Sequence, residues 1–214
     1  MNLDHISYVV PHDQLLDEVQ RIGARLGSGF IDGGIHPRFG TRNFTLPLFD
    51  DLYLEIVCPL DHPAADTSPF GRAVSQRANS GGGWLAWVLA VPDITRVEKQ
   101  LNRNSVDGHR SKPNGIELKW KQIGVLGTIQ DRQLPFFVEW ESSDHPSQDE
   151  KPISSVTTIE IAGNKELISN WVGDEFGKIQ TSVNFSWKSP EDYSGENGII
   201  SVTFSTPTGV FKLE

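Results

Sequence analysis

Two side chains that can bind a metal or move a proton lie inside strand-like runs of the sequence. His5 lies within the apolar run 3–10, and Glu55 lies in the middle of the run 53–57. Side chains alternate between the two faces of a strand, so Glu55 shares a face with Tyr53. A carboxylate among large apolar side chains is costly to bury unless a cation, hydrogen-bond donors or a proton accompany it. His5 and Glu55 are therefore candidates for chemistry.

A polar, glycine-containing stretch precedes the strand of Glu55. Its polar side chains can hydrogen-bond to a carboxylate or to enediolate oxygens, and they are His36, Arg38, Thr41, Arg42 and Asn43. We expect these five residues to contact a substrate, because loops often carry binding residues. A simpler interpretation is that the stretch is only a turn, since glycine and proline mark turns in most proteins.

The two strands bring His5, Glu55 and His36 together if they are close neighbours in one sheet. Imidazole and carboxylate are ligands of Zn, Ni, Mn and Fe, and they are also the groups of general acid–base catalysis. The sequence alone leaves both interpretations open. It also leaves open two structural roles, namely a buried His5 with satisfied hydrogen bonds and an ion pair of Glu55 with Arg38 or Arg42.

Composition and charge are those of an ordinary soluble globular protein. The 214 residues suffice for one large domain or two small ones. The net charge of −9 argues against general binding to nucleic acid or to an anionic membrane. We find no signal-peptide pattern and no uncharged apolar segment of transmembrane length, so we expect a cytoplasmic protein. One cysteine, Cys58, cannot form an internal disulfide.

The predicted elements occur in the same order twice. A strand, a helix and further strands are predicted over 1–58 and again over 83–141, and such internal repeats point to a fold built from copies of one unit. The connector 59–82 is expected to hold a short helix. Residues 144–155 are polar and are expected to be a linker, and 156–214 are expected to form a C-terminal extension, which is a third, partial unit.

The second unit keeps a carboxylate but lacks the imidazole. When the prolines that follow the first strand of each unit are aligned, Ala86 falls at the place of His5. The run 137–140 corresponds to the run 53–56, and this match puts Glu139 at the place of Glu55. A solvated face explains Glu139 as easily as a site does, because Glu141 lies two residues further along and points the same way.

The large aromatic side chains and two of the other histidines have ordinary interpretations. Aromatic residues dominate protein cores, so we expect a core role for Trp84, Trp87, Trp120, Phe136 and Trp140. His109 and His145 lie among turn residues, and we expect them at the surface.

An ordered set of short motifs resembles the vicinal oxygen chelate superfamily and, within it, the glyoxalase-like domain group. The set covers most of residues 1–146 and consists of Leu3-Asp4-His5, residues 33–37, 40–43 and 53–55, Gly108-His109-Arg110, Asn114-Gly115, Trp120, residues 134–137 and His145-Pro146. The resemblance implies an α+β fold in which paired βαβββ modules form a cup-shaped mixed sheet. The pattern of residues 156–214 predicts that a C-terminal βαββ extension follows. The modules of this glyoxalase, bleomycin-resistance and dioxygenase type hold a divalent metal that chelates two neighbouring substrate oxygens.

The resemblance also implies roles for particular residues. His5 and Glu55 match the two metal-ligand positions of the first module, and Glu139 matches the last-strand position of the second module. Ala86 falls at the fourth position and cannot bind a metal, so His36 is the candidate that replaces it. Glu139 and Glu55 are then the candidate catalytic carboxylates, with Glu139 as the base.

The expected function is that of a divalent-metal-dependent lyase or isomerase of glyoxalase type. It would act on a small oxygen-rich molecule, with Zn, Ni, Mn or Fe as the metal. An extradiol-type dioxygenase is an alternative that iron would favour, and Ala86 favours a non-catalytic protein that sequesters a small molecule. A homodimer that forms through the C-terminal unit is a further alternative. We expect neither nucleic-acid nor membrane partners.

Overall fold

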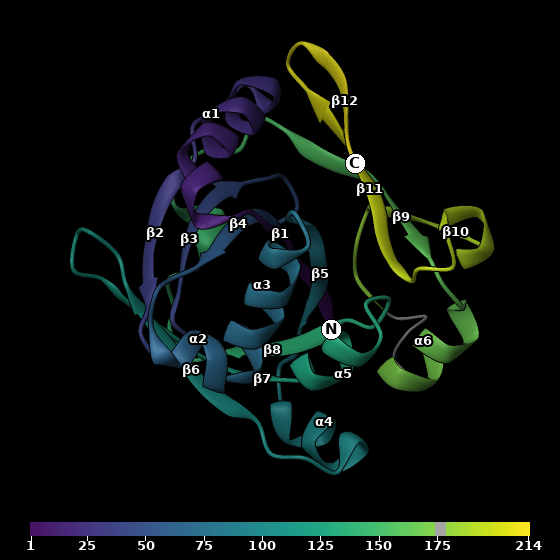
Figure 1. Cartoon of the computed structure of the whole chain (residues 1–214). Coiled ribbons are helices and arrows are strands. Elements are labelled where there is room, and N and C mark those ends of the chain that lie inside the picture. The colour runs from purple at the N-terminus through teal and green to yellow at the C-terminus, as the bar shows by residue number, and fades with distance from the viewer. Residues whose placement is uncertain (174–178) are drawn as a thin grey trace.

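The structure, a computed structural model, describes residues 1–173 and 179–214 (Figure 1). Its larger sheet curls into a nearly closed ring of strands in the order β2-β3-β4-β1-β5-β8-β7-β6. In chain order these strands are β1 (Asn2–Val9), β2 (Ile31–His36), β3 (Thr41–Pro47), β4 (Tyr53–Pro59), β5 (Gly83–Ala90), β6 (Val106–Ser111), β7 (Glu117–Ile123) and β8 (Phe136–Trp140).

This sheet consists of two βαβββ modules, as predicted. In the first module β1 leads through α1 (Leu15–Leu26) to β2, β3 and β4, and β4 pairs with β1 in parallel. In the second module β5 leads through α4 (Ile94–Leu101) to β6, β7 and β8, and β8 pairs with β5 in parallel. Antiparallel pairing of β1 with β5 joins the modules into one sheet. The prediction of a cup-shaped mixed sheet is therefore confirmed.

The two edge strands, β2 and β6, approach each other closely and nearly close the ring. The guanidinium of Arg110 on β6 donates a hydrogen bond to the carbonyl of Gly33 on β2. A Cβ atom at Gly34 would lie 2.5 Å from the carbonyl oxygen of Ser111, and Gly34 has a φ of +89°. Only glycine fits this seam, because it combines a left-handed backbone with a close approach of another chain segment.

Replacing Gly34 by alanine should destabilise the protein more than the same change at Gly115. Both residues have a φ near +90°, but a Cβ at Gly115 meets nothing within 4 Å. Gly115→Ala should therefore cost only the backbone strain, about 1–3 kcal/mol, and Gly34→Ala should cost about 1–3 kcal/mol more because the seam must open. Urea unfolding of both variants measures the difference, and equal losses would show that the seam is not tight.

Helices from the connector fill the concave side of the sheet. The segment 59–82 forms α2 (Pro63–Thr67) and α3 (Pro69–Asn79), and Figure 1 shows α3 lying inside the ring of strands. Side chains from α3, among them Phe70 and Val74, join an apolar cluster with Val57 and Val88 of the sheet. The predicted short helix is confirmed, and its packing leaves only part of the cup open.

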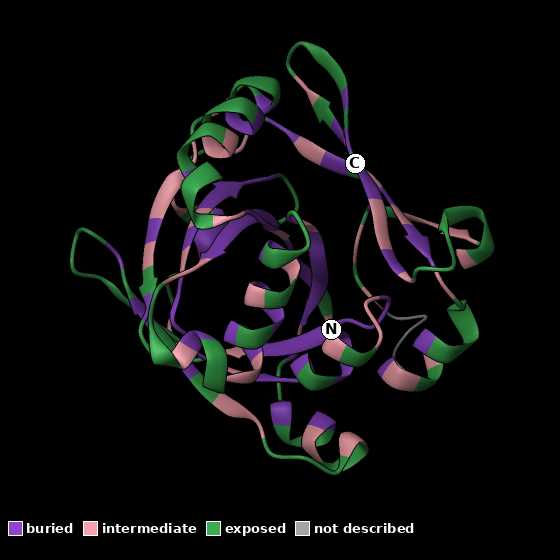
Figure 2. Ribbon diagram, in the orientation of Figure 1, coloured by how far each residue is buried: buried purple, intermediate pink, exposed green. Residues whose placement is uncertain are grey.

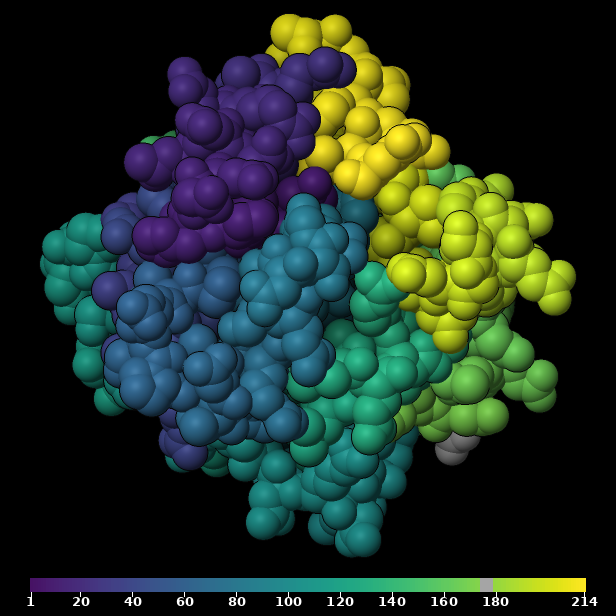
Figure 3. Space-filling view, in the orientation of Figure 1, coloured from purple at the N-terminus to yellow at the C-terminus, as the bar shows by residue number. Residues whose placement is uncertain are grey.

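A second, four-stranded sheet packs beside the first. Residues after 154 form β9 (Ser155–Ala162), α6 (Lys165–Val172), β10 (Asn184–Lys188), β11 (Gly198–Thr206) and β12 (Gly209–Leu213), in the sheet order β10-β9-β11-β12. Within the described residues this unit has one strand before its helix and three strands after it. On the surface in Figure 3, the C-terminal residues, in yellow, lie next to the N-terminal residues, in purple.

The two sheets share one apolar core. The ring of Trp87 on β5 lies 5.0 Å from the ring of Phe185 on β10, and buried side chains of α1 and of both sheets belong to the same cluster. Buried residues follow the strands and exposed residues follow the outer helix faces, as Figure 2 shows. No helix in the described part of the chain combines the length and the apolar character needed to cross a membrane.

Candidate functional site

A small pocket with a cavity volume of about 30 Å³ opens on the concave side of the larger sheet. One half of its wall comes from the first module and is mostly polar, and the other half comes mainly from the second module and is mostly aromatic or apolar. The residues that line it are His5, His36, Asn43, Tyr53, Glu55, Phe70, Arg110, Trp120, Gln122, Phe136, Val138 and Trp140. The pocket is therefore a candidate site in which polar side chains on one wall could react with a ligand and apolar side chains on the other wall could pack against it.

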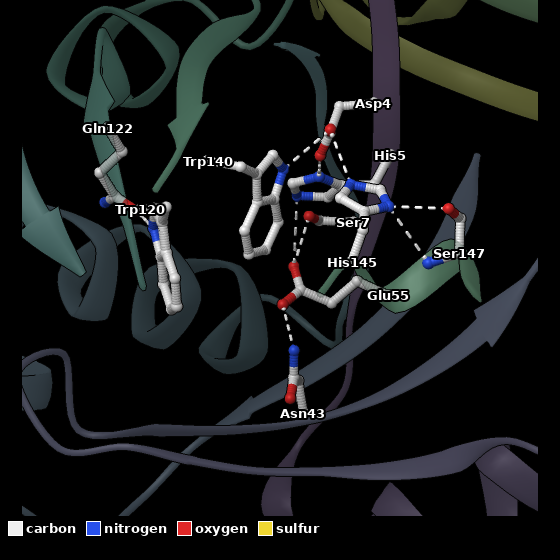
Figure 4. Close-up of polar contacts among 10 residues, drawn as sticks. All are labelled: Asp4, His5, Ser7, Asn43, Glu55, Trp120, Gln122, Trp140, His145 and Ser147. Atoms are coloured by element: carbon white, nitrogen blue, oxygen red, sulfur yellow. Dashed lines mark hydrogen bonds and ion pairs between the residues drawn. The ribbon is translucent and has the colours of Figure 1, made fainter. Parts of the chain in front are cut away.

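Asp4 and His5 form a buried pair at the edge of this pocket (Figure 4). Oδ2 of Asp4 lies 2.6 Å from Nδ1 of His5, while Oδ1 accepts from the indole of Trp140 at 3.0 Å and from Nε2 of His145 at 3.1 Å. Burial alone would raise the pKa of Asp4, but the hydrogen bonds and charges of both histidines hold it well below its usual value. Asp4 is thus an anion that holds His5 through Nδ1–H and leaves Nε2 free to act.

Glu55 faces His5 because of the strand register. Ser7 and Glu55 are partners across the β1–β4 pair, and the hydroxyl of Ser7 donates to Oε2 of Glu55 at 2.6 Å. The amide of Asn43 donates to Oε1 at 2.8 Å, and Nε2 of His5 lies 3.9 Å from Oε2. Burial raises the pKa of Glu55, but His5, His36 and these hydrogen bonds outweigh that effect and lower it. Glu55 is therefore ionised at neutral pH.

His36 lies on the same wall as a neutral imidazole. Its Nδ1 lies 2.9 Å from Oγ1 of Thr41, and its ring packs edge-on against Phe39, Phe70 and Trp120. Burial lowers the pKa of His36 to about 3, although the charge of Glu55 acts in the opposite direction. His36 can therefore exchange hydrogen bonds with a ligand without carrying a charge.

The burial of His36 makes the stability of the folded protein sensitive to mild acid. The folded protein keeps His36 neutral down to a pKa of about 3, whereas the unfolded chain binds a proton near 6.5. Unfolding is therefore favoured as pH falls from about 6.5 towards 3. A His36→Gln variant should lose less stability than the wild type between pH 7 and pH 4.5, and urea unfolding across this range measures it. Parallel losses in the two proteins would contradict a neutral, buried His36.

Some predicted substrate-binding residues do not reach the pocket. Thr41 and Asn43 are buried on the inner face of β3, whereas Arg42 lies on its other face and pairs with Asp32 at 2.6 Å. Arg38 is a half-exposed residue whose guanidinium lies 3.8 Å from Asp107. Alternation along β3 separates Asn43 from Arg42, and the proposed ion pairs of Glu55 with these arginines do not form.

The structure does not bring Glu139 to the pocket. In the β5–β8 pair Val88 lies beside Phe136, just as His5 lies beside Tyr53 in the β1–β4 pair. This register puts Val138 at the place of Glu55, and a shift by one residue moves a side chain to the other face. The carboxylate of Glu139 instead accepts a hydrogen bond from the backbone N–H of Ile94, at the start of α4, at 2.9 Å.

Other parts of the site were not predicted from the sequence. Asp4, Ser7 and Arg110 contribute directly. Asp4 and Arg110 belong to motifs that carry the family resemblance, but the sequence assigned no role to any of the three. His145, which we expected at the surface, contacts Asp4. The aromatic residues assigned to the core divide between two roles, because Trp84 and Trp87 lie in the main core whereas Trp120, Phe136 and Trp140 line the pocket.

The segment predicted as a linker covers one side of the site. A short 3-10 helix, η2 (Pro146–Gln148), lies against β3, and Ser147 and Ser154 are buried. Asp149 forms an ion pair with Lys112 at the end of β6. The ring of His145 lies 4.9 Å from that of Trp140. This segment therefore holds the Asp4 pair in place.

The donors present fit a metal only in part. His5 and Glu55 face each other, but the equivalent positions of the second module, Ala86 or Val88 and Val138, carry no ligand atoms. Within residues 1–173 and 179–214, no three His, Cys, Asp or Glu side chains come together in a way that could hold a metal ion. The predicted set of His5, Glu55, His36 and Glu139 is thus not assembled, and we derive no catalytic step through a metal.

Comparison with known families decides the family. The profile of the glyoxalase-like domain matches residues 3–172. The chain belongs to this family. The glyoxalase-like domain is part of the vicinal oxygen chelate superfamily, whose members commonly use divalent metals. The predicted resemblance is therefore confirmed. That this chain binds a divalent metal stays a prediction.

One solved structure supports the same fold over the whole chain, and two others are more distantly similar. A hypothetical protein from Staphylococcus aureus is 17% identical, with 100% of this chain and 98% of that one covered and a TM-score of 0.70. Methylmalonyl-CoA epimerase from Mycobacterium tuberculosis is 16% identical, with 67% and 89% covered and a TM-score of 0.42. The Streptomyces coelicolor epimerase in complex with 2-nitronate-propionyl-CoA is 14% identical, with 66% and 99% covered and a TM-score of 0.44. No curated protein matches the glyoxalase-like chain.

Proposed function

We propose that this protein is an enzyme that moves a proton at a carbon atom next to a carbonyl group of a small oxygen-rich molecule. The reaction class is that of an isomerase or lyase. The observation that carries the proposal is the imidazole of His5, which lies between the carboxylates of Asp4 and Glu55 at the edge of a small, largely buried pocket. A buried imidazole held in one orientation by a carboxylate is suited to general acid–base catalysis.

His5 is the group that takes the proton. Its Nδ1–H donates to Asp4, so the lone pair of Nε2 faces the pocket and accepts a proton from the substrate carbon. The C–H bond breaks, its electron pair moves into the carbon skeleton to form an enolate, and a new N–H bond forms on His5. Asp4 and Glu55 are anionic and stabilise the resulting imidazolium. Return of the proton to carbon or oxygen completes the reaction.

The enolate oxygen needs hydrogen-bond donors on the opposite side. His36 is neutral, and when Thr41 donates to its Nδ1 its Nε2–H is free to donate to the oxygen. Of the predicted substrate-binding residues, we retain His36 and Asn43 as direct contacts. Thr41 positions His36, and Arg38 and Arg42 have no part in this mechanism.

A second candidate function is binding without turnover. The apolar half of the wall, which includes Phe136 and Val138, supports it, because a pocket that has lost the ligands of one module still encloses a small molecule. The predicted metal-dependent reaction and its dioxygenase form would need ligands beyond His5 and Glu55. All three candidates predict different results in one experiment.

Deuterium incorporation from D2O separates these candidates. The chelator-treated protein is incubated with pyruvate, 2-oxobutyrate, hydroxyacetone and dihydroxyacetone, and NMR follows exchange at the carbon next to the carbonyl group. Exchange without added metal, in at least one compound and above the buffer rate, is the expected result. Exchange that requires Zn, Ni, Mn or Fe would instead favour the predicted metal mechanism. Binding of these compounds with no exchange under any condition would favour the sequestering protein.

A further inference from the structure

We propose that Arg110 binds a carboxylate group of the ligand, so that the substrates of this pocket are small carboxylate-bearing carbonyl compounds. This inference rests on the proposed function for the same site and names its substrate class. It begins from a cation in the pocket wall that the proton-transfer mechanism leaves unused. Arg110 is 2% exposed, and it lies on the inner face of β6 between the outward-facing His109 and Ser111.

The guanidinium of Arg110 is only partly satisfied. Nη1 donates to the carbonyl of Gly33, but Nη2 is buried and has no hydrogen-bond partner. No carboxylate in the described part of the chain forms an ion pair with it. Burial lowers the pKa of Arg110, partly offset by Tyr53 and Glu55, yet a guanidinium stays protonated in proteins. An unpaired buried cation is costly, and an anionic ligand would remove that cost.

The neighbourhood of Arg110 is shaped around this open position. A Cβ atom at Gly33 would lie 2.1 Å from Oδ1 of Asn43 and 2.7 Å from Nη1 of Arg110, so only glycine lets both side chains reach the pocket. The planar guanidinium suits a carboxylate better than a hydroxyl group, because its nitrogens match two carboxylate oxygens.

Charge balance supports a carboxylate in this position. Glu55 on the same wall is an anion, and it would repel a negatively charged ligand if no cation were present. Both oxygens of Glu55 are already hydrogen-bonded by Ser7 and Asn43, which leaves Arg110 as the free partner for a ligand. The small size of the pocket limits the ligand to a short carbon chain, so the carbonyl group and the carboxylate must lie close together.

Paired ligands test the inference by affinity alone. Pyruvate and hydroxyacetone share a methyl ketone and differ in a carboxylate against a hydroxymethyl group. Titration calorimetry or ligand-observed NMR should show that the wild type binds pyruvate at least tenfold more tightly. Arg110→Met should lose at least tenfold in pyruvate affinity and leave hydroxyacetone unchanged. Arg72→Met, at an exposed arginine on α3, is the matched control and should change neither affinity.

A second variant guards against misfolding at the β2–β6 seam. Arg110→Lys keeps the cation and a donor for the Gly33 carbonyl, so it should remain folded and retain an intermediate affinity for pyruvate. Equal affinities of the wild type for the two ligands, or an unchanged pyruvate affinity in folded Arg110→Met or Arg110→Lys, would overturn the inference. His5→Gln should keep the preference for pyruvate, so a failure of proton transfer leaves this binding result intact and is distinguishable from it.

Discussion

Replacing His5 by glutamine should lower the rate of deuterium exchange by about 10²–10⁴-fold, the range expected when a general base is removed. Glutamine can still hydrogen-bond to Asp4, but it cannot accept a proton at neutral pH. The variant therefore replaces the buried imidazole beside Asp4 with a neutral side chain of similar length. Affinity for pyruvate should change much less than the exchange rate, because the carboxylate contact proposed at Arg110 is untouched. NMR exchange rates and calorimetric affinities on the same samples measure the two quantities.

A variant of a second histidine is the matched control for this result. His109 is exposed on β6, next to Arg110, and His109→Gln should leave the exchange rate within about twofold of the wild type, as expected for a surface change. If folded His5→Gln exchanged deuterium at the wild-type rate, His5 would not be the base. The proposed mechanism would then be wrong even if the protein proved to be an enzyme.

The modular architecture could be predicted because it rests on local patterns. The helix predicted from the spacing of apolar residues forms as α1, and these residues are Leu15, Leu16, Val19, Ile22 and Leu26. Leu15, Ile22 and Leu26 become buried, whereas Leu16 is exposed. The first strand of the second module is a continuous apolar run, which suits a strand buried on both faces, whereas Asp4, His5 and Ser7 interrupt the first strand of the first module. The internal repeat then required only that the two copies pair, and the antiparallel contact of β1 with β5 supplies that pairing.

The second half of the site could not be predicted, because strand register is not a local property. Matching the run 137–140 to the run 53–56 put Glu139 at the place of Glu55, yet the register of β8 against β5 differs from that match by one residue, and Val138 faces the pocket. A single-residue shift reverses every side chain of a strand. The neighbouring helix then gives Glu139 a structural role through the N–H of Ile94.

Long-range partners were the other part that the sequence could not supply. Asp4 is adjacent to His5 in the chain, but its value depends on Trp140 and His145, which are more than 130 residues away. Arg110 differs from other arginines only because the ring of strands closes beside Gly33. No local pattern distinguishes such residues from surface charges, and only the tertiary fold shows that they are buried.

Replacing Asp4 by asparagine should affect both stability and catalysis. The carboxylate of Asp4 accepts hydrogen bonds from His5, His145 and Trp140. In the variant these three donors lose their anionic acceptor, and one of them faces the NH2 group of the asparagine. Breaking a buried charged pair typically costs about 3–5 kcal/mol. The exchange rate should fall as well, because nothing then holds the Nδ1–H tautomer of His5 that leaves Nε2 free.

The pH dependence separates the charge of Asp4 from simple packing. The pKa of Asp4 lies below its ordinary value of 3.8 in the folded protein, so its stabilising effect is present above pH 3.8 and is lost as pH falls below that value. The stability gap between wild type and Asp4→Asn should therefore narrow below about pH 4.

Trp140→Phe tests whether the charge of Asp4 acts through His5. The variant removes one hydrogen bond to Asp4 but keeps the contact with His5, so it should retain most of the exchange activity that Asp4→Asn loses. If the difference in stability between the wild type and Asp4→Asn stayed constant down to pH 2.5, packing, and not the ionised carboxylate, would be what stabilises this region. Equal exchange rates in Asp4→Asn and Trp140→Phe would show that Asp4 does not act through His5.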